Sequence, residues 1–169
     1  RLLTPVGKVP VLEDPALGHP IGESGAILIW LAEYYGQFLP TEVAQRYEVI
    51  QWLMVQMANI GPMLGQFTHF RLLPEGTEPY SYGRYAALAK TIYQLINDRV
   101  STREWIAGDA YSIADIATLP WAEYLERHDL SIEDYPDLKR WREAVAVRPA
   151  VIRAKQRIFE KFSAPAAET

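Results

Sequence analysis

The most constraining feature of the sequence is the helical spacing of its apolar residues, which dominates the chain beyond Pro40. Apolar residues that recur at this spacing line one face of a helix and can be buried together. One such stripe comprises Tyr47, Ile50, Met54, Met57 and Leu64, and a second runs from Tyr85 to Leu95. The chain after residue 40 is therefore expected to be all-helical.

Local signals predict where several of these helices begin and break. The spacing Ser112-x-x-Asp115 suits a capping box, in which each side chain accepts a hydrogen bond from the other residue's backbone amide. Pro136 and Pro149 are expected in the first turns of two further helices, where a missing amide proton costs nothing. Gly61-Pro62 should kink or interrupt a helix, because proline cannot donate the backbone hydrogen bond.

The first 36 residues have a different pattern. Val9–Glu13 is expected to be a short strand, and Ile21 and Gly22 the end of a second one. A helix is then expected with Ser24 as its N-cap and Gly36 as the residue that terminates it. Two short strands do not make a stable sheet, since three or more strands with a covered face are usually needed. This β-β-α segment therefore resembles half of a unit, and a β-α-β piece is expected ahead of Arg1.

Composition excludes several classes of function. Acidic and basic residues are interspersed and the net charge is −4, so no surface is expected to bind nucleic acid. The chain has no cysteine, so any thiol chemistry must come from a ligand, and no metal site is expected. No apolar run approaches the roughly 18 residues of a membrane span, and a cytoplasmic protein is expected.

Four blocks of sequence carry a resemblance to a known family. They are GKVPVLED (7–14), ESGAILIWLAEYYG (23–36), QWLMVQMANIGPMLGQFTHF (51–70) and YSIADIATLPW (111–121). Together they resemble the cytosolic glutathione S-transferases, and the third block is similar to the bacterial nu-class branch that includes disulfide-bond oxidoreductases. The resemblance implies an α+β protein that forms a homodimer. Residues 1–38 would be the C-terminal half of a thioredoxin-like domain, and residues 42–169 the all-helical C-terminal domain.

The resemblance also implies a glutathione site in the first two blocks. Val9 would pair its backbone with the cysteinyl part of glutathione, next to a cis Pro10. Glu23 and Ser24 would hold the γ-glutamyl end, because a helix N-terminus accepts a carboxylate and a neighbouring carboxylate pairs with an ammonium group. Lys8 would reach the glycyl carboxylate. With no family in view, a helix cap alone is the favoured interpretation of Ser24.

The implied activity is that of a transferase or disulfide-bond reductase that uses bound glutathione thiolate against a small electrophile or a disulfide. No catalytic residue can be named, because the family's thiolate-holding residue belongs to the β-α-β unit, without which the 169-residue chain is expected to be inactive. The chain has Val6-Gly7-Lys8 where nu-class reductases commonly have Asn-Asn-Lys or Asn-Gly-Lys, so thiol transfer or ether cleavage is an alternative to disulfide reduction. A non-catalytic binding or assembly protein is the second hypothesis.

Other residues allow both a functional and a structural interpretation. Arg84 and Tyr85 could line an acceptor pocket or bind glutathione across a subunit interface, or they could belong to the interdomain core. His69 could act as an acid or base, although a lone histidine is more often structural. Ser112 and Asp115 are assigned to capping rather than to catalysis.

Overall fold

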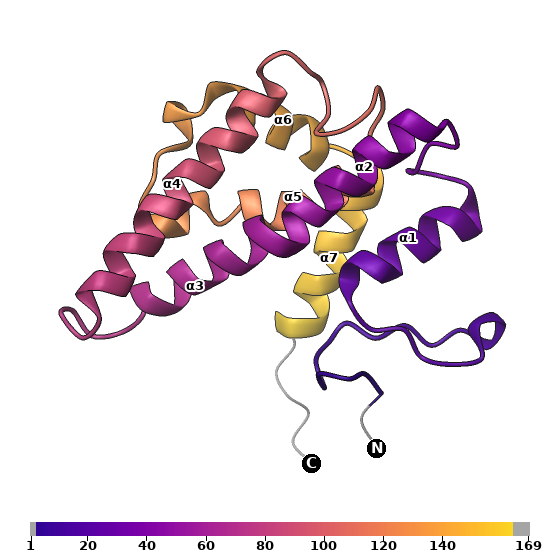
Figure 1. Ribbon diagram of the computed structural model, residues 1–169, viewed down its shortest axis with the longest axis horizontal. Coiled ribbons are helices and arrows are strands. Elements are labelled where there is room, and N and C mark those ends of the chain that lie inside the picture. The colour runs from indigo at the N-terminus through magenta and orange to yellow at the C-terminus, as the bar shows by residue number, and fades with distance from the viewer. Residues whose placement is uncertain (1–2, 164–169) are drawn as a thin grey trace.

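The computed structural model describes residues 3–163 and is built from helices joined by short connections (Figure 1). The longer helices are α1 (Ser24–Tyr35), α2 (Val43–Val55), α3 (Gly61–Arg71), α4 (Pro79–Ser101), α5 (Ile113–Ala122), α6 (Pro136–Ala146) and α7 (Pro149–Ser163). The short elements are the 3-10 turns η1 (Pro15–Leu17), η3 (Leu125–His128) and η4 (Ile132–Asp134), and the π-helical turn η2 (Gln56–Ile60). Figure 1 shows α2 and α3 following one another along one line, with α4 returning beside α3.

The predicted strands are the first point of difference. Among residues 3–163 no strand is formed, and the pairing expected between Val9–Glu13 and Ile21–Gly22 is reduced to one antiparallel bridge between Leu12 and Ile21. Two backbone hydrogen bonds of 2.8 and 2.9 Å form this bridge. A pair of short strands is only marginally stable unless a third strand or a packed face supports it, so the pairing stays limited to this bridge. The predicted α+β class is therefore represented here by helices and one bridge.

Helix α1 begins differently from the prediction. Its N-cap is Glu23 and not Ser24, because the carbonyl of Glu23 accepts the first backbone hydrogen bond, from Ile27 at 3.0 Å. The backbone of Glu23 has φ 64° and ψ 113°, which turns the chain into the helix one residue earlier than the sequence suggested. The helix ends as predicted at Gly36, whose φ of 63° suits a residue without a Cβ.

The predicted break at Gly61-Pro62 takes the form of a π-helical turn. The amide of Gly61 donates to the carbonyl of Gln56, five residues earlier, and Pro62 then occupies the first turn of α3. Proline has no amide hydrogen to donate to the preceding turn, and the wider turn falls where that ordinary helical hydrogen bond is missing. The sequence therefore located the irregularity correctly, and the structure shows that it is a wider turn rather than a gap between helices.

The buried face of α2 differs from the predicted stripe. Val49 and Leu53 are fully buried, whereas Tyr47 and Met54 are 65% and 45% exposed. Both sets have helical spacing, so the sequence could not decide between them. Packing against α5 selects the face that carries Val49 and Leu53.

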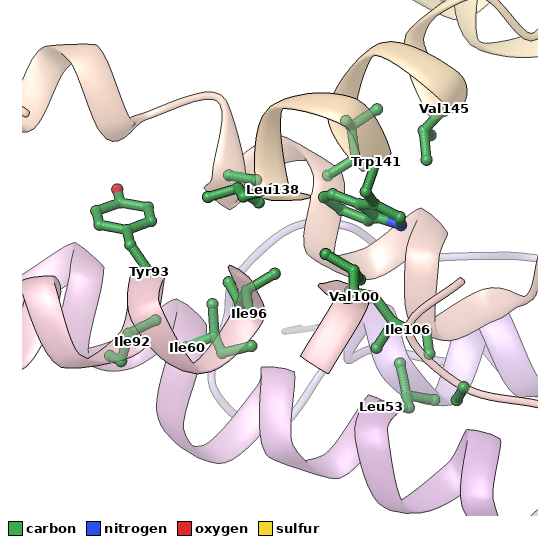
Figure 2. Packing of buried hydrophobic residues seen from close by; sticks show 14 of the residues in the cluster. Leu53, Ile60, Ile92, Tyr93, Ile96, Val100, Ile106, Leu138, Trp141 and Val145 are labelled. Carbon is green, nitrogen blue, oxygen red and sulfur yellow. The ribbon is translucent and has the colours of Figure 1, made fainter. Parts of the chain in front are cut away.

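The main core lies between α4, α6 and the line formed by α2, η2 and α3. In Figure 2, Leu138 and Trp141 of α6 lie across from Ile96 and Val100 of α4, and Ile60 lies beside Ile96. These large side chains are completely shielded from solvent, and burial of each contributes about 1.5–3 kcal/mol to stability. This core gives the elements around the N-terminal loop a rigid support. Within residues 3–163, no helix has the length and apolar character that a membrane crossing requires.

Candidate functional site

The loop around Val9 presents its backbone to solvent. The Val9–Pro10 peptide bond is cis, and Val9 is 89% exposed. Among the described residues, neither the amide nor the carbonyl of Val9 takes part in a backbone hydrogen bond with another residue. Both groups are therefore free to pair with an extended ligand, as an added strand would.

Thr4 contacts both the Lys8–Pro10 segment and Gly22. The buried Thr4 hydroxyl donates to the carbonyl of Lys8 at 3.4 Å. Thr4 also packs against Gly22, where an added Cβ would lie only 2.5 Å from Thr4 Cγ2. This close approach ties the Lys8–Pro10 segment to the residues that lead into α1.

Glu23 and Ser24 lie at the N-terminus of α1 and are both exposed. No side chain caps this terminus, and among residues 3–163 neither Glu23 nor Lys8 belongs to an ion pair. The Ser24 hydroxyl has a weak partner, the thioether sulfur of Met57 at 3.7 Å. The helix amides and the Ser24 hydroxyl can bind a carboxylate, and the Glu23 carboxylate can bind an ammonium group. This terminus therefore suits a ligand that carries both groups.

A cavity of about 320 Å³ lies between this N-terminal segment and the helical bundle. Its wall is mostly apolar, with two polar side chains. The lining residues are Pro10, Ser24, Ile27, Leu28, Gln56, Met57, Ile116, Ala117, Pro120 and Trp121. The structure thus brings together Pro10 and Ser24, two of the residues predicted from sequence, with side chains of η2 and α5. A mostly apolar cavity with a few polar groups is typical of a small-molecule site.

Gln56 is a residue of this cavity that the sequence interpretation missed. It is 4% exposed, and its Oε1 has no hydrogen-bond partner among the described residues. Room for this side chain depends on Gly61, where an added Cβ would lie 3.0 Å from Gln56 Nε2 and 3.1 Å from Trp121 Nε1. The available signal was a glutamine within an apolar helical stripe, a few residues before Gly61-Pro62. Met57, interpreted as core packing, also lines the cavity.

Arg84 and Tyr85 are not part of this cavity. Arg84 is exposed on α4 and lines a separate surface hollow with Tyr80 and Leu88. Tyr85 stacks on Phe70, with ring centroids 5.3 Å apart. His69 is exposed, and its ring contacts the edge of Phe70. Within residues 3–163 no cluster of three or more histidines and carboxylates could hold a metal ion.

Ser112 and Asp115 form a capping box at the start of α5. The carboxylate of Asp115 accepts from the Ser112 amide at 2.9 Å, and the Ser112 hydroxyl accepts from the Ala114 amide at 3.2 Å. Asp115 also accepts from the Ile106 amide at 2.9 Å and from the indole nitrogen of Trp141 at 2.8 Å. Burial raises the pKa of Asp115, and these hydrogen bonds oppose that shift. Each group has a structural partner, which agrees with a role in folding.

Comparison with known proteins places these features in context. Residues 85–149 match the family described as glutathione S-transferase, C-terminal domain. The chain is similar to the disulfide-bond oxidoreductase YfcG of Escherichia coli (strain K12), with 40% identity over 88% of this chain and 71% of the relative. It is also 36% identical, over 95% of this chain, to a glutathione S-transferase domain-containing protein of Dictyostelium discoideum, of which it spans 65%.

The fold is similar to that of a solved structure. A glutathione transferase from Burkholderia graminis, with two glutathione molecules bound per subunit, matches with a TM-score of 0.81 and 43% identity. The match covers 89% of this chain and 68% of that one. The chain thus spans about two thirds of the length of the proteins it resembles, from 65% to 71%.

Proposed function

The chain belongs to the glutathione S-transferase family, and from that premise we propose that it binds glutathione along Lys8–Pro10 and at the N-terminus of α1. The observation that supports this proposal most directly is the exposed pair Glu23 and Ser24 at a helix terminus that no side chain caps, where the Ser24 hydroxyl has only the weak thioether partner of Met57 among the described residues. The bound glutathione of the Burkholderia graminis transferase agrees with such a ligand. We assign the protein to the nu-class branch, as the third sequence block suggests.

Each residue of the proposed site has a chemical role that its position allows. The amide and hydroxyl of Ser24 would bind the γ-glutamyl carboxylate, and Glu23 would pair with the α-ammonium group. The free backbone groups of Val9 would hold the cysteinyl part in an extended conformation. Lys8 would neutralise the glycyl carboxylate. The glutathione sulfur would then lie near Pro10 and face the cavity.

We propose that the reaction is attack of the glutathione thiolate on a small electrophile or on a disulfide sulfur. The cavity lies beside Pro10 and Ser24, so it would receive the electrophile next to the thiolate. The name of the Escherichia coli relative favours a disulfide, whereas Val6 in place of the family's asparagine favours the other acceptors. The group that holds the thiolate is not assigned among residues 3–163, so turnover is proposed for the intact protein and not for the 169-residue chain by itself.

The test separates ligand binding from folding. In the intact protein, Glu23→Gln and Ser24→Ala should each weaken glutathione binding about tenfold, since each removes a charge-assisted interaction. Neither should change the melting temperature by more than about two degrees, because neither side chain caps α1. Calorimetric titration and thermal melts measure both quantities.

The matched control is Glu75→Gln, which removes an exposed carboxylate from the connection between α3 and α4. It should bind glutathione as the parent does. If Glu23→Gln also bound as the parent does, the γ-glutamyl assignment would be wrong. Glutathione binding by the intact protein without turnover of a chloroaryl substrate or a mixed disulfide would instead favour the binding or assembly protein.

A further inference from the structure

Trp121 forms one wall of the cavity beside Pro10 and packs against α3 on its other side. The indole is half-buried and lines the cavity, whereas Gly61 and Gly65 of α3 are not among the lining residues. An added Cβ at Gly61 would lie 3.1 Å from Trp121 Nε1 and 3.2 Å from Cε2, and one at Gly65 would lie 3.5 Å from Cη2. The indole therefore lies lengthwise across the two glycines, between α3 and the cavity.

The backbone does not explain why residue 61 is a glycine. Gly61 has φ −57° and ψ −57°, an ordinary helical conformation, and glycine is less favourable than alanine in a helical segment. What this position requires is space. An added Cβ would lie 3.0 Å from Gln56 Nε2 and 3.1 Å from the nearest indole atom, closer than the roughly 3.5–4.0 Å at which non-bonded atoms pack.

An alanine at position 61 would therefore displace side chains that line the cavity. Gln56 and Trp121 both belong to its wall. Because the indole has α3 on one side and the cavity on the other, movement away from Gly61 would carry it into the cavity. Gly65 differs, since a distance of 3.5 Å is an ordinary packing contact and an alanine fits there without such movement.

We propose that Gly61 and Trp121 together determine acceptor specificity, by setting how large a group on the glutathione sulfur the cavity accepts. This inference rests on the proposed function, in which the sulfur faces the cavity. Protein interiors are close-packed, so the indole holds its place only as long as Gly61 leaves room for it. The size limit applies to an electrophile and to a disulfide alike, because it depends on space and not on the reacting atom.

The experiment uses glutathione conjugates with groups of increasing size on the sulfur. We would titrate the intact protein with S-methyl-, S-benzyl- and S-(1-naphthylmethyl)glutathione. In Gly61→Ala the preference for the benzyl over the methyl conjugate should fall at least about fivefold, because the displaced indole takes up space that the ring needs.

Gly65→Ala is the matched control. It adds the same methyl group to the same helix, where the group meets only ordinary contacts, and it should keep the benzyl preference of the parent. Glutathione alone should bind equally to the parent and to both glycine variants. A purely structural role of Gly61 would instead lower the melting temperature without changing how affinity depends on the size of the conjugate.

A smaller wall residue should have the opposite effect. In Trp121→Leu the naphthylmethyl conjugate should gain at least about threefold in affinity relative to the benzyl conjugate, compared with the parent. In the double variant that combines Gly61→Ala with Trp121→Leu, the added methyl group no longer meets the indole. The change in benzyl preference that Gly61→Ala causes should therefore shrink to less than about twofold.

The outcomes distinguish this inference from the proposed function. If the parent binds the three conjugates equally, if Gly61→Ala keeps the benzyl preference, or if Gly65→Ala loses it to the same extent, the assignment is wrong while glutathione binding stands. If Gly61→Ala does not fold, Trp121→Leu decides, and an unchanged affinity of the naphthylmethyl conjugate relative to the benzyl conjugate overturns the assignment. If neither glutathione nor any conjugate binds the parent, the proposed function fails.

Discussion

At the scale of single residues, His128 shows how burial restricts an ionisable group. Its ring is 3% exposed and lies within hydrogen-bond distance of two hydroxyls, Thr68 Oγ1 at 2.8 Å and Tyr93 Oη at 2.7 Å. Burial lowers the pKa of His128, and the nearby charge of Arg71 lowers it further, against the opposite effect of Asp129. The folded protein therefore holds this imidazole in its neutral form.

This depressed pKa predicts a loss of stability in mild acid. As the pH falls below about 6.5, the histidine of the unfolded chain takes up a proton that the folded protein does not bind. The free energy of unfolding should therefore decrease as the pH falls toward the folded pKa, by up to about 1.4 kcal/mol per pH unit. Urea denaturation at pH 7.5, 6.5 and 5.5 measures this slope.

His128→Gln should flatten that slope, because glutamine can still donate and accept but does not titrate. The matched control is His69→Gln, which changes an exposed histidine and should leave the slope as it is in the parent. A slope that is the same in His128→Gln and in the parent would show that other groups cause the acid sensitivity.

Single residues also show the limits of sequence interpretation at the site. Pro10 and Ser24 were expected at the site from the family resemblance, and the two residues line one cavity. The cap assignment of Ser24 was wrong, because the choice of first helical residue depends on the backbone of Glu23, which nothing in the side-chain pattern reveals. Gln56 was missed for a related reason: an unsatisfied atom is defined by its neighbours in space.

At the scale of elements, the start of α5 depends on Asp115. This carboxylate joins three parts of the chain, since it accepts from the Ser112 amide, from the Ile106 amide and from the Trp141 indole. Asp115→Ala would leave four buried donors without this acceptor, since the Ser112 hydroxyl also donates to it, and we expect a loss of at least about 3 kcal/mol. Denaturant unfolding measures the loss.

The comparison is Ser112→Ala, which removes the hydroxyl of the same capping box. It should cost only about 1 kcal/mol, the usual value for an N-cap, because Asp115 keeps its other partners. Equal losses in the two variants would contradict the view that Asp115 connects α5 to α6 and to the preceding loop.

Helix ends were easier to predict than buried faces. Gly36, Pro136 and Pro149 mark ends that the structure confirms, because capping and proline geometry act within one turn of the chain. The predicted buried stripe was wrong at Tyr47 and Met54 of α2, which are exposed, although Ile50 does pack against the core; contacts with α5 decide which face is buried. The expected strands were also hard to predict, because strand formation depends on partners distant in sequence. The described residues form one bridge in their place.

At the scale of the whole molecule, the homodimer implied by the family resemblance stays a prediction, and α2 and α4 both carry exposed apolar side chains. Tyr47 and Met54 lie exposed on α2, and Tyr80 and Leu95 on α4. We expect a two-fold dimer in which the segment from Gln51 to Gln66 lies at or near the interface and buries apolar surface. Light scattering of the intact protein at low micromolar concentration measures the mass.

Met54→Lys should shift the protein toward monomer, because it would bury a charge without a partner at the interface. Ile158→Lys is the matched control on α7, where an equally apolar side chain is 60% exposed, and it should leave the mass unchanged. A parent protein that is monomeric under these conditions would refute the dimer.

The π-helical turn has a consequence for how the length of this chain can vary. A turn closed by a five-residue hydrogen bond, from Gly61 to Gln56, holds one residue more than an ordinary helical turn. Deleting one residue from 56–60 would therefore shorten this segment to the length of an ordinary helical turn. The cavity wall can gain or lose a side chain in one mutational event, so diversification of this surface over evolution does not require the bundle to be rebuilt.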